Sequence, residues 1–100
     1  MGKWLPEERW LKLKDGSECP MCIEPHSPEN KFTFLIKELN SCYVRLPKNQ
    51  FTYGWTIVVL KRHACELFEL TPEELKEYWT EVAAVAKGLD SIFKPVKINY

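Results

Sequence analysis

The chain has 100 residues, of which 45% are hydrophobic and 13% aromatic, and this suits one small domain with a modest core. Fourteen basic side chains balance fourteen acidic ones, and a formal net charge of zero argues against general nucleic-acid binding, which relies on a basic field. No apolar run reaches the roughly 18 residues that a membrane span needs. The start MGKWLP also lacks the apolar stretch of a signal peptide and the hydroxyl residue of a myristoylation signal. We therefore expect a soluble cytoplasmic protein that has neither nucleic acid nor membrane as a partner. In that compartment the four cysteines are expected to be reduced thiols or metal ligands.

Residues 1–16 are predicted to form an N-terminal extension or short helix. The Pro-Glu-Glu start favours a helix over 6–14, and Asp15-Gly16 is typical of its end. A polar, proline-rich loop follows over 15–31 and contains the sequence ECPMC.

Two adjacent antiparallel strands are predicted next, over 32–39 and 41–46, with Asn40 near the turn between them. The segment 55–63, WTIVVLKRH, is the most apolar run of the chain. Such a run is typical of a strand buried on both faces, so we expect it to be central in the sheet.

A long helix over about 71–93 is the clearest prediction. Thr71 and Glu74 form a capping box around a proline at the first helical position. Apolar side chains then recur at helical spacing and form one stripe. They are Leu75, Tyr78, Trp79, Val82, Val85, Ala86, Leu89 and Phe93. A stripe this wide needs a sheet to cover it, so the order of elements predicts an α+β fold with a mainly antiparallel sheet.

The last segment, 96–100, alternates apolar and polar residues with the period of a strand that has one buried face. Because no turn signal follows it, we expect this strand to pair with a further strand that comes after it.

Cys19 and Cys22 are spaced so that both thiolates can reach one tetrahedral metal ion from a single tight loop. Redox motifs share this spacing, although a thioredoxin-like pair would end a strand and open a helix, and here the surroundings are loop-like. Zinc needs two further ligands. His26 and His63 are the candidates, and His63 could equally be a solvent-exposed strand end.

The other two thiols, Cys42 and Cys65, are expected to be small buried hydrophobic residues. His26 lies in the proline-rich loop and is expected to be solvated.

Three stretches together resemble the histidine triad (HIT) proteins. GWTIVVLKRHACELFELTPEEL is similar to their glycine-led strand, which ends at a basic-basic-histidine step and leads into a capped helix. CPMC resembles the zinc-binding cysteine pair of many bacterial members, and FKPVKINY resembles the strand that precedes the family signature. The resemblance covers roughly residues 17–100.

The family signature, His-φ-His-φ-His-φ-φ with φ apolar, is absent, because the chain's two histidines are His26 and His63. The resemblance therefore implies a single incomplete HIT-like domain over 1–100, truncated so that the final catalytic strand is missing. Full-length relatives hydrolyse or transfer nucleotidyl groups of nucleoside phosphoramidates and dinucleoside polyphosphates through a histidine nucleophile. No catalytic residue can be assigned here, and we expect the chain to be inactive alone.

The resemblance also implies a set of binding residues. Cys19, Cys22 and His63 match three zinc ligands, whose fourth partner in relatives is a histidine near the signature. Asn99 and Met21 match residues that contact the nucleotide. The expected partners are a purine nucleotide and a second copy of the chain in a homodimer. The alternatives are a small zinc-stapled binding or structural domain without catalysis, and a C-x-x-C oxidoreductase.

Overall fold

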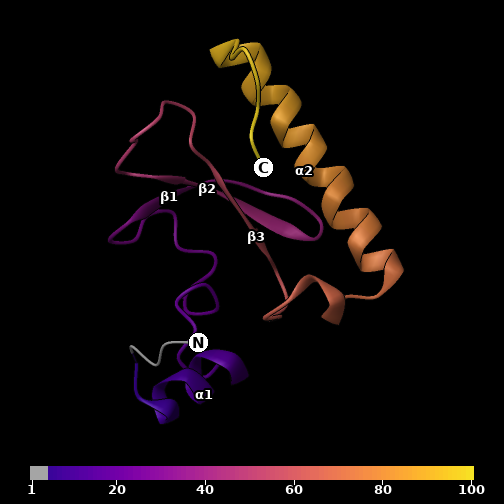
Figure 1. The fold of residues 1–100 in the computed structure, drawn as a ribbon. Coiled ribbons are helices and arrows are strands. Elements are labelled where there is room, and N and C mark those ends of the chain that lie inside the picture. Colours follow the sequence, from indigo (N-terminus) through magenta and orange to yellow (C-terminus); the bar gives the residue numbers. More distant parts are fainter. Residues whose placement is uncertain (1–4) are drawn as a thin grey trace.

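The computed structural model describes residues 5–100, so the first four residues of the predicted N-terminal extension lie outside the described part. Figure 1 shows the elements in chain order. They are helix α1 (Glu7–Asp15), strands β1 (Thr33–Glu38), β2 (Cys42–Pro47) and β3 (Ile57–Leu60), the short 3-10 helix η1 (Leu67–Glu69) and helix α2 (Pro72–Phe93). The predicted α+β class and both predicted helices are confirmed. From residue 5 onward, no helix is both long and apolar enough to cross a membrane.

The sheet is antiparallel, with the strand order β1-β2-β3. The predicted strands over 32–39 and 41–46 are confirmed as the neighbours β1 and β2, and the turn between them contains Asn40. Their register shifts between Leu35 and Lys37, which marks a bulge in β1.

The prediction that 55–63 forms a central strand is wrong. β2 is the central strand of the described sheet, and β3 is shorter than predicted and pairs with β2 alone. Five of the six β2 residues are buried, whereas all four β3 residues are only half-buried. Successive β3 side chains point to opposite faces of the sheet, and the side chains on both faces are half-buried. The segment is apolar throughout for this reason. An edge strand can meet that condition.

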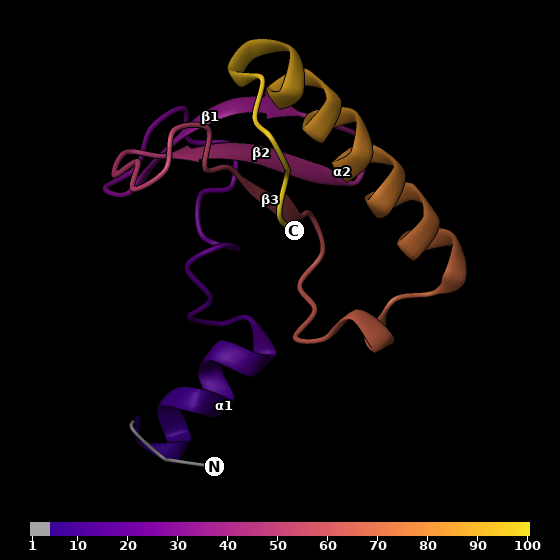
Figure 2. The ribbon, with the colours of Figure 1, turned by 45° about the horizontal axis from the view of Figure 1, so that its top comes forward.

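Helix α2 begins at the predicted capping box. The Thr71 hydroxyl accepts a hydrogen bond from the Glu74 amide at 3.1 Å, and the Glu74 carboxylate accepts one from the Thr71 amide at 2.9 Å. The helix lies along one face of the sheet (Figure 2) and buries Val82 and Ala86. Six of the eight residues of the predicted apolar stripe are buried or half-buried, which bears out this face for most of its length, whereas Trp79 and Phe93 are exposed.

A carboxylate fastens α2 to the turn between β1 and β2. Glu81 accepts hydrogen bonds from the amides of Asn40 at 2.9 Å and Ser41 at 2.8 Å, and from the Ser41 hydroxyl. The Cys42 thiol lies 3.5 Å from the same carboxylate and is fully buried. The burial confirms the predicted role of Cys42 as a small buried residue. Burial and the charge of Glu81 raise the pKa of Cys42 to about 11.

The predicted strand over 96–100 is wrong. Lys94 ends α2 in the left-handed region with φ of 49°, and the following residues form no strand and no sheet hydrogen bond in the described chain. Val96 is fully exposed, and Ile98 is half-buried. The alternating pattern indicates which side chains favour burial. A strand also needs hydrogen-bond partners for its backbone, and no described strand pairs with 96–100.

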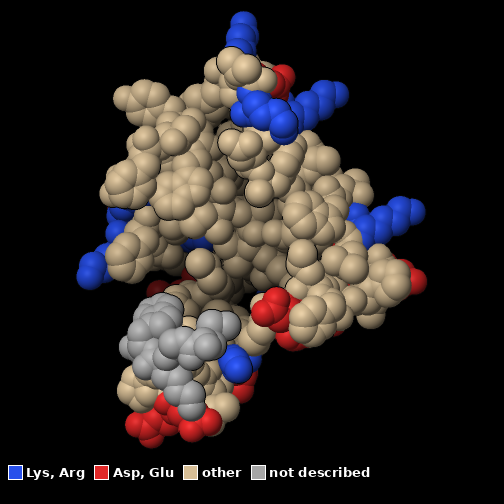
Figure 3. All heavy atoms as spheres, viewed as in Figure 1, with Lys and Arg blue, Asp and Glu red and all other residues tan. Residues whose placement is uncertain are grey.

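The tail instead lines a groove of about 690 Å³ between α2, Val58 and the loop 51–56. Both ribbon views show the tail turning back from the end of α2 and running toward β3 (Figures 1 and 2). Gly54, with φ of 88°, lets the Phe93 ring approach the loop so closely that an added Cβ would lie 3.0 Å from it. The same face is uncharged over its centre, with charged side chains around its margin (Figure 3).

Candidate metal centre

The cysteine loop begins where α1 ends. Gly16 adopts φ of 89°, a left-handed conformation that suits glycine at the end of a helix, and it reverses the chain. The amide of Cys22 then donates to the carbonyl of Cys19 at 3.0 Å, which closes the C-x-x-C segment into a tight turn. Both thiols therefore project from one short loop.

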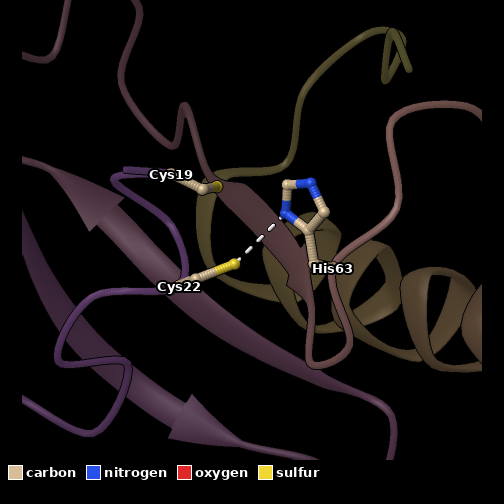
Figure 4. A group of neighbouring side chains, drawn as sticks. All are labelled: Cys19, Cys22 and His63. Carbon is tan, nitrogen blue, oxygen red and sulfur yellow. Dashed lines mark hydrogen bonds between the residues drawn. The ribbon is translucent and has the colours of Figure 1, made fainter. Parts of the chain in front are cut away.

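His63 reaches the same place from the segment that follows β3. Its Nδ1 atom lies 3.3 Å from the sulfur of Cys22. One ligand atom from each of Cys19, Cys22 and His63 lies within 4.8 Å of the others, and all three side chains are partly buried. Figure 4 shows the two sulfurs and the ring nitrogen facing one another. The structure thus brings together the three residues predicted as metal ligands.

The opposite edge of the imidazole fixes its tautomer. His63 Nε2 lies 2.6 Å from the backbone carbonyl of Lys14, in the last turn of α1. A carbonyl can only accept, so Nε2 carries the proton, and the lone pair of the neutral ring lies on Nδ1, facing the cysteines. A metal-ligating histidine commonly donates its other N–H in this way.

Gly16 also makes room for the ring. A Cβ added there would lie 3.2 Å from Cγ of His63, closer than most such contacts. The same glycine therefore ends α1 and allows the imidazole to pack against the backbone.

The site favours a charged thiolate at Cys19. Burial works to raise its pKa, but hydrogen bonds from the Cys22 side chain and the Met21 amide keep the pKa of Cys19 below its usual value. Burial and the neighbouring Cys19 thiolate raise the pKa of Cys22. The bond to the Lys14 carbonyl, together with Cys19, raises the pKa of His63.

The donor set fits zinc. Two thiolates and one neutral imidazole are soft and borderline ligands of the kind that Zn²⁺ takes in tetrahedral sites. Cys19, Cys22 and His63 would hold the ion, which leaves one coordination position for a further ligand. A zinc ion bound there would cross-link the cysteine loop to the end of β3 and contribute folding free energy.

The remaining thiol and histidine lie outside this group. His26 is exposed and contacts Glu38 at 3.2 Å and Tyr43 at 3.3 Å, as expected of a solvated residue, so in the described residues it is not drawn into the metal group. The prediction that Cys65 is buried is wrong: it is exposed, and its sulfur lies 3.5 Å from the Lys14 carbonyl. Cys65 lies between β3 and η1, in a segment that is not part of the sheet.

A buried arginine ties the cysteine loop to the sheet. Arg45 on β2 is only 6% exposed and donates to the Thr33 hydroxyl at 2.8 Å. Its other nitrogens donate to the carbonyls of Pro25 at 3.1 Å and Ser27 at 2.9 Å. The two bonds to these carbonyls tie the loop to β2, and so they help to place the cysteines, whereas the bond to Thr33 joins β2 to β1.

The two residues predicted to contact a nucleotide lie apart. Met21 is half-exposed and lines a hollow of about 80 Å³ together with Ile57 and Val59. Asn99 lines the large groove together with Val58. Because neighbouring residues of a strand point to opposite faces, Met21 and Asn99 lie on opposite faces of the sheet.

Sequence reasoning missed three contributors to the site: the Lys14 carbonyl, the contact of Gly16 with the ring, and the Arg45 anchor. The sequence showed that Gly16 ends a helix, but it did not show that Gly16 contacts the His63 ring. A basic residue in a predicted strand with apolar neighbours was the available signal for Arg45.

Fold and site together define a small α+β domain with a Cys₂His group suited to zinc. The chain is 33% identical over 51 residues to "Protein hit" of Bacillus subtilis strain 168. The match covers 51% of this chain and 35% of that protein, so the chain spans about a third of the length of the curated relative it matches. No family model matches the chain, and no solved structure matches it.

Proposed function

We propose that this chain is the zinc-binding part of a HIT-type nucleotide-binding protein, a protein class whose full-length members act on nucleotidyl groups through a histidine nucleophile that this chain lacks. The observation that carries the proposal is the meeting of Cys19, Cys22 and His63 around one point, although His63 lies 41 residues beyond Cys22. The pair and the histidine belong to two of the three stretches that resemble the family.

Under this proposal the zinc ion is structural. Cys19 and Cys22 supply thiolates, His63 supplies Nδ1, and the fourth ligand is a water molecule or a group from outside residues 5–100. Under the proposal the isolated chain binds a purine nucleotide. It does not hydrolyse the nucleotide, because no residue is assigned to bond cleavage. Asn99 and Met21 remain the proposed nucleotide contacts. Because they lie on opposite faces of the sheet, each would meet a nucleotide at a different site of a homodimer.

The proposal is tested in two stages with the reduced chain. The first stage measures Co²⁺ and Zn²⁺ binding, and we expect one ion per chain with the thiolate-to-cobalt charge-transfer bands of a two-cysteine site. The second stage adds AMP and follows amide shifts at Asn99 and Met21 by NMR. Absence of metal binding would contradict the proposal. Cleavage of adenosine phosphoramidate that is lost on His63→Ala would show that the active site has been wrongly placed.

A small zinc-stapled domain without a nucleotide site is the second candidate. It is favoured by the position of Met21 and Asn99 on opposite faces of the sheet, where one small ligand would not reach both. It predicts one bound metal ion per chain and a cooperative thermal unfolding transition that a chelator abolishes. It also predicts that AMP causes no amide shifts. Sedimentation of the metal-loaded chain tests the homodimer independently of either candidate.

A further inference from the structure

Helix α1 has no buried residue, yet it meets the candidate metal centre directly. Two side chains from the segment after β3 hydrogen-bond to it, His63 at 2.6 Å and Cys65 at 3.5 Å, and both bonds go to the carbonyl of Lys14. Both ribbon views show α1 standing apart from the sheet and from α2 (Figures 1 and 2).

We propose that α1 is a supporting part of the metal centre, with the Lys14 carbonyl and Gly16 acting as positioning groups for His63, so that metal binding and the docking of α1 stabilise each other. This inference rests on the proposed metal centre, and it concerns only the residues that hold the imidazole.

The Lys14 carbonyl contributes through the ring proton. Carbonyls in the last turn of a helix have no partner within the helix and are free to accept. By accepting from Nε2, this carbonyl holds the proton away from Nδ1 and keeps the lone pair of Nδ1 directed at Cys22, 3.3 Å away. The partial negative charge at the helix end also stabilises the positive charge that the ring gains when Nδ1 binds a cation.

Gly16 contributes through space and backbone geometry. Its left-handed φ of 89° turns the chain from α1 into the cysteine loop, and the absent Cβ allows the ring to lie against this turn. A single residue thus sets the distance between the end of α1, the two cysteines and the imidazole.

The coupling must act in both directions. If docked α1 increases the affinity for the metal by some factor, the metal stabilises the docked helix by the same factor. Loss of an outer contact to a metal-ligating histidine typically weakens metal affinity roughly tenfold to a hundredfold. We therefore expect a roughly tenfold effect both on the metal affinity and on the docking equilibrium of α1.

The experiment uses the full chain and Co²⁺ as the probe. Gly16→Ala is compared with Gly54→Ala, a matched control with nearly the same φ, 88°, and a similar clash, but against Phe93, remote from the metal centre. Gly16→Ala is expected to weaken Co²⁺ binding roughly tenfold, whereas Gly54→Ala changes it by less than about twofold. A ¹⁵N spectrum of the His63 ring is expected to show the Nε2-protonated tautomer in the unaltered chain.

Hydrogen exchange on the unaltered chain provides a second readout that needs no variant. Adding Co²⁺ should slow the exchange of the α1 amides roughly tenfold, by reciprocity. Equal cobalt affinity in the two glycine variants, or α1 exchange that does not respond to the ion, would overturn this inference while leaving the metal centre in place. Failure of the unaltered chain to bind Co²⁺ would instead overturn the proposed function, and this inference with it.

Discussion

The metal-centre end of the molecule and the sheet–helix end are held together by different interactions. At the metal-centre end, α1 buries no residue, and the Lys14 carbonyl in its last turn bonds to the segment after β3. At the other end, α2 buries Val82 and Ala86 over the sheet and is fastened by Glu81. The first region depends on polar contacts around a small group of ligands, and the second depends on packing. Under the proposed metal centre, removal of a bound ion should therefore loosen α1 and the cysteine loop while α2 keeps its place.

Arg45 connects the two regions. It belongs to the central strand of the packed end, and its hydrogen bonds reach the loop that carries the cysteines. Substitutions at either end and at Arg45 therefore distinguish the stability that depends on the proposed metal centre from the stability that depends on the packed core.

The largest expected effect is on metal affinity, in Cys22→Ser. A structural zinc site has a binding free energy of about 10–16 kcal/mol, so one of four ligands contributes about 3 kcal/mol, or roughly a hundredfold in affinity. Competition against a chromophoric chelator would measure this loss. Cys65→Ser is the matched control: that thiol lies outside the ligand group, and serine keeps a donor for the Lys14 carbonyl, so affinity should stay near that of the unaltered chain. An equal loss in both variants would contradict the assigned ligand set.

The next largest effect is expected for Arg45→Lys. Lysine keeps the charge but cannot reproduce the forked donor set, so the carbonyls of Pro25 and Ser27 lose their partners. Unfolding in urea should become easier by about 2–3 kcal/mol. Arg9→Lys, at an exposed position, should change the free energy of unfolding by less than about 0.5 kcal/mol. If Arg45 joins the two regions, Arg45→Lys should also weaken Co²⁺ binding, and unchanged cobalt affinity would restrict its role to stability.

At the packed end, Glu81→Gln should lower the free energy of unfolding by about 1–2 kcal/mol, because the amide side chain replaces a charged acceptor of several hydrogen bonds. Glu77→Gln is the control, since its carboxylate is exposed and accepts one bond from the Asn40 side chain. Metal affinity should be unchanged in both variants. A loss of cobalt affinity in Glu81→Gln comparable to that in Cys22→Ser would contradict the separation of the two regions.

The local signals in the sequence were reliable. The capping box at Thr71 and the helix end at Gly16 depend on chemistry within a few residues, and the structure bears both out. It also places the two cysteines together on one loop. The position of β3 and the fate of 96–100 were not predictable, because a strand's neighbours are chosen by distant partners. His63 was one of two candidate histidines, and only the family resemblance favoured it over His26. Its bond to the Lys14 carbonyl, 49 residues away, leaves no side-chain signal in the sequence.

The smallest effect concerns the start of α2 and is read through pH. The Arg62 guanidinium, and after it the Thr71 amide, lower the pKa of Glu74 from an ordinary 4.5 to about 2. Because the folded-state pKa lies below the ordinary value, this stabilisation is fully present above pH 4.5 and is lost as the pH falls toward 2. Arg62→Gln should raise the pKa of Glu74 toward 4.5, as followed by ¹³C NMR of the carboxyl group, and should move the acid-induced loss of helix to higher pH. Arg9→Gln removes an exposed ion pair at the metal-centre end and should leave the titration of Glu74 unchanged. If Glu74 still titrates near 2 in Arg62→Gln, the capping amide rather than the guanidinium sets its charge, and the first turn of α2 is stabilised within the helix alone.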